Sequence, residues 1–165
     1  MIREARNAIK IEAKSGRISQ VPIDPTETIL QGDLLKWDGT ARKATKMTAA
    51  ADGATFMGMS DHTNPQASAG STTSDYTKSY LNVVQSALVS LIAGAAETLY
   101  PFDIVEMVTD AQHIQKTITA ANVVGVVDPG WAGTAGKLVA IGDEVKVWLK
   151  TRAAYTGFGG SDLLI

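Results

Sequence analysis

A short phrase, Gly-Asp followed by a brief apolar run, constrains the fold of this chain most strongly. It first occurs as GDLLKWDG at residues 32–39, where Asp38-Gly39 ends the run. Gly32 permits a tight turn and Asp33 can hydrogen-bond the backbone of that turn, while Asp-Gly between two strands is a hairpin signal. The phrase therefore predicts a short strand with a turn at each end. It also predicts that these carboxylates form turns and are not catalytic.

The phrase returns later in the chain, as FDIVEM and again as GDEVKVWL near the end. Asp103 lies 70 positions after Asp33, since 103 minus 33 is 70. After Asp33 and again after Asp103, the chain continues in the same order: a turn, a second apolar strand with a glycine, and a loop that contains proline. This self-similarity predicts an internal duplication, with related strand-turn-strand units over residues 25–94 and 95–152 that form one compact body.

The apolar runs between the turns predict strands, and the whole chain is predicted to be all-β. A content of 15 glycines and a charged fraction of only 19% favour short strands and turns over long helices. The expected strands cover residues 34–37, 54–59 and 83–91 in the first unit, and 102–107, 122–128 and 145–150 in the second. In the last strand, Val145, Val147 and Leu149 are expected to face inward, and Lys146, Trp148 and Lys150 outward.

The residues that usually carry chemistry are sparse or poorly spaced. Without cysteine, a disulfide scaffold, a thiolate metal site and a cysteine nucleophile are impossible. His62 and His113 show no metal-binding spacing, and no nucleophile elbow of the GxSxG type occurs. Residues 130–137 end in a lysine, but Leu138 and a strand follow, so a flexible loop is expected there and not a phosphate loop. We therefore expect no enzyme, no metal and no cofactor.

Positive charge is concentrated at the N-terminus, where a basic arm over residues 1–24 is predicted. Residues 1–20 carry five basic side chains against two glutamates, a net charge of +3, whereas the whole chain has −2. The basic residues are Arg3, Arg6, Lys10, Lys14 and Arg17. One interpretation is a solvated terminus, and the other is an arm that docks on an acidic neighbouring surface. The body is acidic and has few aromatic residues, so direct nucleic-acid binding is not expected.

The last segment, residues 153–165, is predicted to be a glycine-rich apolar tail. Its apolar side chains are Tyr155, Phe158, Leu163, Leu164 and Ile165. A free tail has little reason to expose them, so we expect it either to fold back on its own body or to dock on a neighbouring subunit. The sequence has no apolar run of signal-peptide or membrane-spanning type, which favours a soluble protein made in a cytoplasm.

GDLLKWDGTARKAT followed by ATFMGMSD resembles the capsid decoration, or cement, proteins of tailed bacteriophages. The resemblance covers residues 27–61 and is echoed at residues 99–128. It implies a β-barrel or β-tulip body on the outer surface of the mature head, commonly as homotrimers that clamp neighbouring major capsid proteins. It implies no catalysis. Family members usually show one such unit, so the second unit departs from the pattern and leaves the number of copies open.

Two other classes remain possible at the level of sequence. The first is another virion structural component, such as a head fibre or a tail part. The second is a small carbohydrate-binding or hydrolytic β domain, which would need Trp37, Trp131 and Trp148 to cluster on an exposed face.

Overall fold

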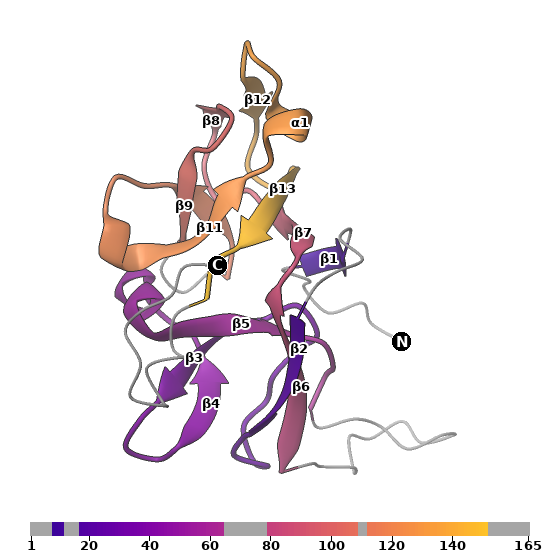
Figure 1. Cartoon of the computed structure of the whole chain (residues 1–165), viewed down its shortest axis with the longest axis vertical. Helices are drawn as coiled ribbons and strands as arrows, with labels where there is room; N and C mark the ends of the chain where they lie inside the picture. Colours follow the sequence, from indigo (N-terminus) through magenta and orange to yellow (C-terminus); the bar gives the residue numbers. More distant parts are fainter. Residues whose placement is uncertain (1–7, 12–16, 65–78, 109–111, 152–165) are drawn as a thin grey trace.

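The structure is a computed structural model that describes residues 8–11, 17–64, 79–108 and 112–151 (Figure 1). The described chain confirms the all-β prediction, because strands dominate and helices are few and short. The strands are β1 (Ala8–Ile11), β2 (Arg17–Pro22), β3 (Leu34–Asp38), β4 (Lys43–Lys46), β5 (Phe56–Ser60), β6 (Tyr80–Ser86), β7 (Leu88–Ile92), β8 (Glu97–Leu99), β9 (Ile104–Met107), β10 (Ile114–Lys116), β11 (Val123–Val127), β12 (Lys137–Val139) and β13 (Glu144–Leu149). The helical elements are η1 (Ala50–Thr55), η2 (Ala120–Asn122) and α1 (Pro129–Ala132).

Two antiparallel sheets form the body and share one strand order. The five-stranded sheet has the order β2-β6-β5-β3-β4, and the six-stranded sheet has the order β1-β7-β13-β11-β9-β10. If β1 is set aside, each strand of the first sheet has a counterpart in the second. A separate pair, β12 and β8, forms a small ribbon at the upper end of the molecule in Figure 1.

The pairing registers also match, which supports the predicted duplication. Leu35 of β3 lies opposite Gly58 of β5, and Val105 of β9 lies opposite Gly125 of β11. The next pair along each ladder shows the same one-residue irregularity. We call residues 17–64 and 79–86 the first unit and residues 88–151 the second unit. The strand order and the register of the first unit are therefore repeated in the second.

The boundary between the units differs from the prediction. The expectation of a single strand over residues 83–91 is wrong, because β6 ends at Ser86, β7 begins at Leu88, and the two strands belong to different sheets. Ala87, which is fully buried, marks the change. The run is apolar on both faces because both faces of the sheet are covered here, so its periodicity carried no sign of the break.

Two further expectations are corrected by the described residues. Parts of the predicted arm are strands: β1 pairs with β7, and β2 pairs with β6. The loop expected at residues 130–137 begins with the short helix α1. Asp128 caps this helix by accepting a hydrogen bond from the backbone N–H of Trp131, and proline occupies the first turn.

Each unit has an inner core at equivalent positions. In the first unit the inner cluster consists of Val21, Ile23, Ile29, Leu35, Ala44, Met57, Leu81 and Val83. The matching positions of the second unit, Leu91, Ala93, Leu99, Val105, Ile114, Val124, Val145 and Val147, are all buried as well. A parallel bridge joins Ile23 to Ala44, and its counterpart joins Ala93 to Ile114. The closed barrel or tulip stays a prediction.

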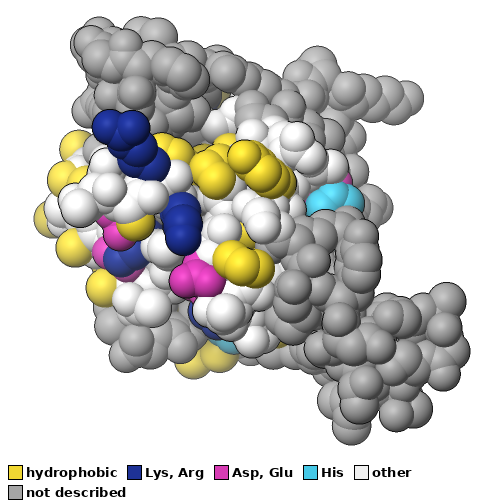
Figure 2. Space-filling model, turned by 90° about the horizontal axis from the view of Figure 1, so that it is seen from below, with side chains coloured by type: hydrophobic (Ala, Val, Ile, Leu, Met, Phe, Trp, Pro, Cys, Tyr) yellow, Lys and Arg dark blue, Asp and Glu magenta, His cyan; other side chains and the backbone are white. Residues whose placement is uncertain are grey.

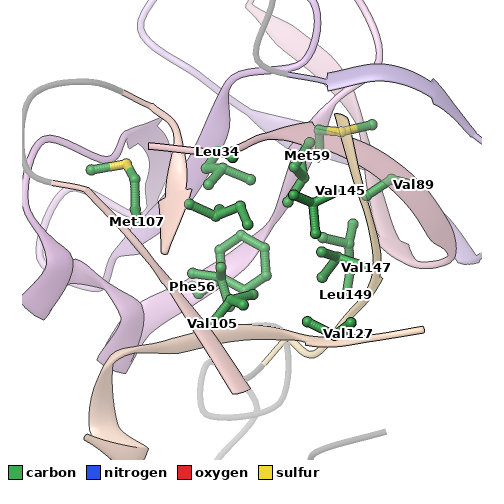
Figure 3. Close-up of a cluster of buried hydrophobic side chains, with 14 of the residues drawn as sticks. Leu34, Phe56, Met59, Val89, Val105, Met107, Val127, Val145, Val147 and Leu149 are labelled. Carbon is green, nitrogen blue, oxygen red and sulfur yellow. The ribbon is translucent and has the colours of Figure 1, made fainter. Parts of the chain in front are cut away.

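A second core lies between the units. Leu34, Phe56 and Met59 do not belong to the inner cluster of the first unit but to the apolar cluster of the second, and Figure 3 shows them beside Val105, Val145 and Val147. The turns η1 and η2 also meet here, so closely that a Cβ atom at Gly53 would lie 2.1 Å from the carbonyl oxygen of Asn122. The two units are therefore packed directly against each other.

Candidate interaction surfaces

One turn occurs three times in the structure, and each copy uses an aspartate in the same way. The Oδ2 atom of the aspartate accepts a hydrogen bond from the backbone N–H three residues earlier. The pairs are Asp33 with Leu30 at 2.8 Å, Asp103 with Tyr100 at 2.8 Å, and Asp143 with Ala140 at 2.9 Å. The backbone N–H of each aspartate donates in return to the carbonyl of the same partner. These carboxylates therefore form turns, as the sequence predicts for Asp33.

The residue before each aspartate has a positive φ, and here the three turns differ. Gly32 and Gly142 have φ of 93° and 97°, whereas the equivalent Phe102 has φ of 66°. Glycine adopts this conformation freely, but a side chain raises its cost by of order 1 kcal/mol. Phe102 is also 69% exposed. Its ring is thus held at the surface by a turn that would suit glycine better.

Glu106 and Asp52 are partly buried carboxylates outside these three turns, and both accept hydrogen bonds from the short connections between strands. Burial raises the pKa of Glu106, but hydrogen bonds from Asn122, Gln115 and Thr117 outweigh this and lower it. The pKa of Asp52 is lowered in the same way against burial, by the backbone of Thr48 and by Lys36. Among the described residues, no group of His, Asp and Glu is arranged to hold a metal ion.

Most of the exposed large apolar side chains lie on the second unit. The described examples there are Tyr100, Phe102, Ile118, Leu138, Ile141 and Trp148, and only Tyr80 lies on the first unit. Exposed apolar side chains that gather on one region of a protein often mark a contact surface. The second unit is therefore the better candidate for such a surface.

Three apolar side chains form a continuous row on the outer face of the second unit. Val126 of β11 lies opposite Ile104 of β9 on one side and opposite Trp148 of β13 on the other. Residues that lie directly opposite each other share a face of the sheet. Ile104 and Val126 are half-buried, and Trp148 is 36% exposed. We call these three residues the outer row of the second unit.

The three tryptophans are divided between the two units. Trp131 and Trp148 both bind Asp128, through the backbone N–H of the former and the indole Nε1 of the latter. Lys137 lies over the ring of Trp131, with Nζ 4.6 Å from its centroid. Trp37 instead packs against the inner cluster of the first unit. This packing weighs against a sugar-binding platform built from all three rings.

The described surface seen from below carries mixed charges. Figure 2 shows basic, acidic and hydrophobic side chains interspersed there. A strong single-sign field would steer a charged partner, and this part of the surface provides none.

Most residues predicted to bind partners lie outside the described residues. This applies to Arg3, Arg6, Lys14, Tyr155, Phe158, Leu163, Leu164 and Ile165. The backbones of Lys10 and Arg17 lie in β1 and β2, and their side chains are not described.

Sequence reasoning missed Gln112 and the outer row. Gln112 is buried, and its side chain binds the backbone of Leu34 and Met47 in the first unit. The residue 70 positions earlier is Arg42, so alignment of the two units gives no hint of a shared glutamine. The row could have been found by comparing outward-facing positions of the two units.

Among the described residues, none of the helices is long and apolar enough to cross a membrane. No protein family model and no curated protein sequence matches this chain.

Proposed function

We propose that this protein is a bacteriophage capsid decoration, or cement, protein that binds the outer surface of the mature head. It staples neighbouring major capsid proteins and so stabilises the shell. The observation that carries this proposal is the use of the three aspartate turns: their carboxylates form turns, while most of the exposed large apolar side chains among the described residues lie on the second unit. Polar groups that stabilise the backbone and apolar groups that remain exposed are what a rigid binding protein needs. The capsid is proposed as the partner because residues 27–61 resemble decoration proteins.

The physical logic of stapling favours a preformed body with additional contact segments. A rigid body binds without a large ordering cost, and segments that order on binding can add contact area. Many equivalent sites on a shell then strengthen attachment through multivalency. The basic N-terminal segment is proposed to engage an acidic capsid surface or a neighbouring copy. The apolar C-terminal segment is proposed to contact a neighbouring subunit.

The test is co-sedimentation of the purified protein with expanded capsids, at increasing salt concentration. We expect saturable binding, and reduced occupancy when Arg3, Arg6, Lys10, Lys14 and Arg17 are all replaced by Gln. A matched control replaces five basic residues of the body, Lys43, Lys116, Lys137, Lys146 and Lys150, so that the net charge changes equally. Equal losses in both variants would overturn the role of the arm.

The remaining outcomes concern the function itself. A wild-type protein that ignores shells would overturn the capsid proposal. If it formed free fibres or rings instead, another virion component would be favoured. If it bound glycans through the exposed Trp148, a carbohydrate-binding domain would be favoured.

A further inference from the structure

The outer row of the second unit has an exact counterpart in register on the first unit, and there it is covered. Leu34, Met59 and Val84 lie opposite one another across β3, β5 and β6. They are 0%, 3% and 0% exposed, because they belong to the core shared with the second unit (Figure 3). A row of three opposed apolar side chains thus occurs in both units. It is buried in the first unit and half-exposed in the second.

The cover on the first unit is provided in part by the β9–β10 hairpin end of the second unit. Met107, at the end of β9, joins the shared core. Gln112 precedes β10, and its Oε1 atom accepts from the backbone N–H of Leu34 at 2.6 Å. Its Nε2 atom donates to the carbonyl oxygens of Met47 at 2.6 Å and of Leu34 at 3.4 Å. Apolar packing of Met107 and side-chain hydrogen bonds from Gln112 to the backbone therefore both fix this contact.

The equivalent hairpin of the first unit, β3–β4, has an exposed end. Arg42 occupies the position of Gln112, and the two residues have nearly equal φ of 55° and 56°. Trp37 occupies the position of Met107 and is only half-buried. Residues 39–42 are exposed, and the β3–β4 hairpin lies at the lower end of the molecule in Figure 1. This hairpin end therefore carries an exposed cation, Arg42, beside the half-buried ring of Trp37.

We propose that a second copy of this chain covers the outer row of the second unit with the hairpin end of its own first unit. The contact between copies then repeats the contact between units within one chain. Such a contact is heterologous, because two different surfaces meet, and repeated contacts of this kind close into a ring when the rotation between copies permits it. This inference goes beyond the proposed function, since it concerns self-association and needs no capsid.

The charges at the two surfaces are complementary in this arrangement. Glu106 lies two residues after Ile104, and its hydrogen-bond donors among the described residues are all neutral. In the internal contact, Gln112 reaches the carbonyl oxygen of Met47, whose counterpart in the second unit is Thr117, which binds Glu106. An arginine in the place of Gln112 would therefore lie near the carboxylate. Arg42 supplies that cation, which favours a second copy over an unrelated partner.

The first test is the solution mass of the protein by light scattering over a range of concentrations. We expect a discrete oligomer, and we expect a monomer for Val126→Glu in the outer row and for Arg42→Glu in the hairpin. The control Leu138→Glu places the same charge on β12, at a side chain that is 76% exposed, and should keep the wild-type mass. Circular dichroism and thermal melting check that each variant is folded. A monomeric wild type, or folded variants that keep its mass, would overturn the proposal.

Mixing the two variants gives a second and sharper test. Each variant retains the surface that the other has lost, so an equimolar mixture should form a dimer of twice the chain mass. The outer row of Val126→Glu and the hairpin of Arg42→Glu each carry a new glutamate, so these two surfaces should not associate. A symmetric contact between identical surfaces would not be rescued in this way, so the absence of a dimer would also overturn the proposal. A monomeric wild-type protein that still binds capsids would leave the proposed function standing.

Discussion

The two units share a strand order, a register and a set of eight core positions, but they use their outer faces differently. In the first unit the row of Leu34, Met59 and Val84 is part of a core. In the second unit the equivalent row is half-exposed and includes the larger Trp148. Backbone pairing and inner packing are common to both units and therefore define their shared fold. The outer face and the hairpin end can then change without altering the fold.

The hairpin ends show the same freedom. Gln112 makes three hydrogen bonds to the neighbouring unit, whereas Arg42, at the same backbone angle, is exposed. The positive φ is common to both because the hairpin geometry requires it. The residue type at this position differs with the surroundings of each hairpin: Gln112 contacts the first unit, and Arg42 is exposed.

The largest expected effect comes from disturbing the close contact between η1 and η2, which joins the two units. Gly53→Ala places a methyl group 2.1 Å from the carbonyl oxygen of Asn122, and backbone cannot yield cheaply. We expect a loss of about 4 kcal/mol in the free energy of unfolding, measured by urea denaturation. Gly39→Ala is the control, since a Cβ atom there meets nothing within 4 Å. Comparable losses in both variants would show that the contact between η1 and η2 is unimportant.

The next prediction compares equivalent positions of the two inner cores. Leu35 and Val105 occupy the same place and are both 0% exposed. Leu35→Ala should cost about 3 kcal/mol and Val105→Ala about 2 kcal/mol, because the leucine leaves the larger cavity. Denaturant midpoints measure both. If only one unit were sensitive, the two cores would not be equivalent in energy.

The three aspartate turns should rank by burial. Asp33 is 1% exposed, Asp103 is half-buried and Asp143 is exposed. Replacement by alanine should therefore cost about 2 kcal/mol at Asp33, about 1 kcal/mol at Asp103 and less than about 0.5 kcal/mol at Asp143, because buried donors lose more when they lack an acceptor. Thermal melting of the three variants tests the order. An equal loss at Asp143 would show that burial does not set the cost.

The smallest effect concerns pH. The pKa values of Asp52 in the first unit and Glu106 in the second are lowered in the folded protein. Each carboxylate therefore adds stability above its unfolded pKa, and this stability is lost as pH falls through the folded value. Glu106→Gln should flatten the decline in stability between about pH 5 and pH 3, by less than about 1 kcal/mol because the group is partly exposed. An unchanged pH profile would contradict the role of Glu106.

Local pattern was enough to predict part of the strands and turns, namely those close to the Gly-Asp and Asp-Gly pairs and the alternating strand near the C-terminus. Gly32-Asp33 and Asp38-Gly39 each mark a turn that the structure contains, and β13 faces the core with Val145, Val147 and Leu149 as its alternation predicts. The 70-residue offset of Asp103 from Asp33 also predicted a duplication, and the two sheets share their strand order. The turns and the alternation of β13 are encoded within a few neighbouring residues, so they are readable without tertiary contacts.

The candidate surfaces depended on contacts between distant residues. The outer row lies on three strands, and its members become neighbours only through pairing. The partners of Gln112 lie 78 and 65 positions away. The residues predicted from charge and apolar content, such as Arg3 and Tyr155, fall outside the described residues, so their role stays a prediction.

By itself, the sequence determined the all-β class, the turns at Gly32-Asp33 and Asp38-Gly39, and which side chains of β13 face the core. These depend on side-chain periodicity and on the backbone preferences of Gly and Asp, which act over a few residues. Only the tertiary structure decided that the chain changes sheet at Ala87 and which of two similar rows is buried. Those outcomes depend on how one unit packs on the other, and packing free energy arises from surfaces assembled across the whole chain.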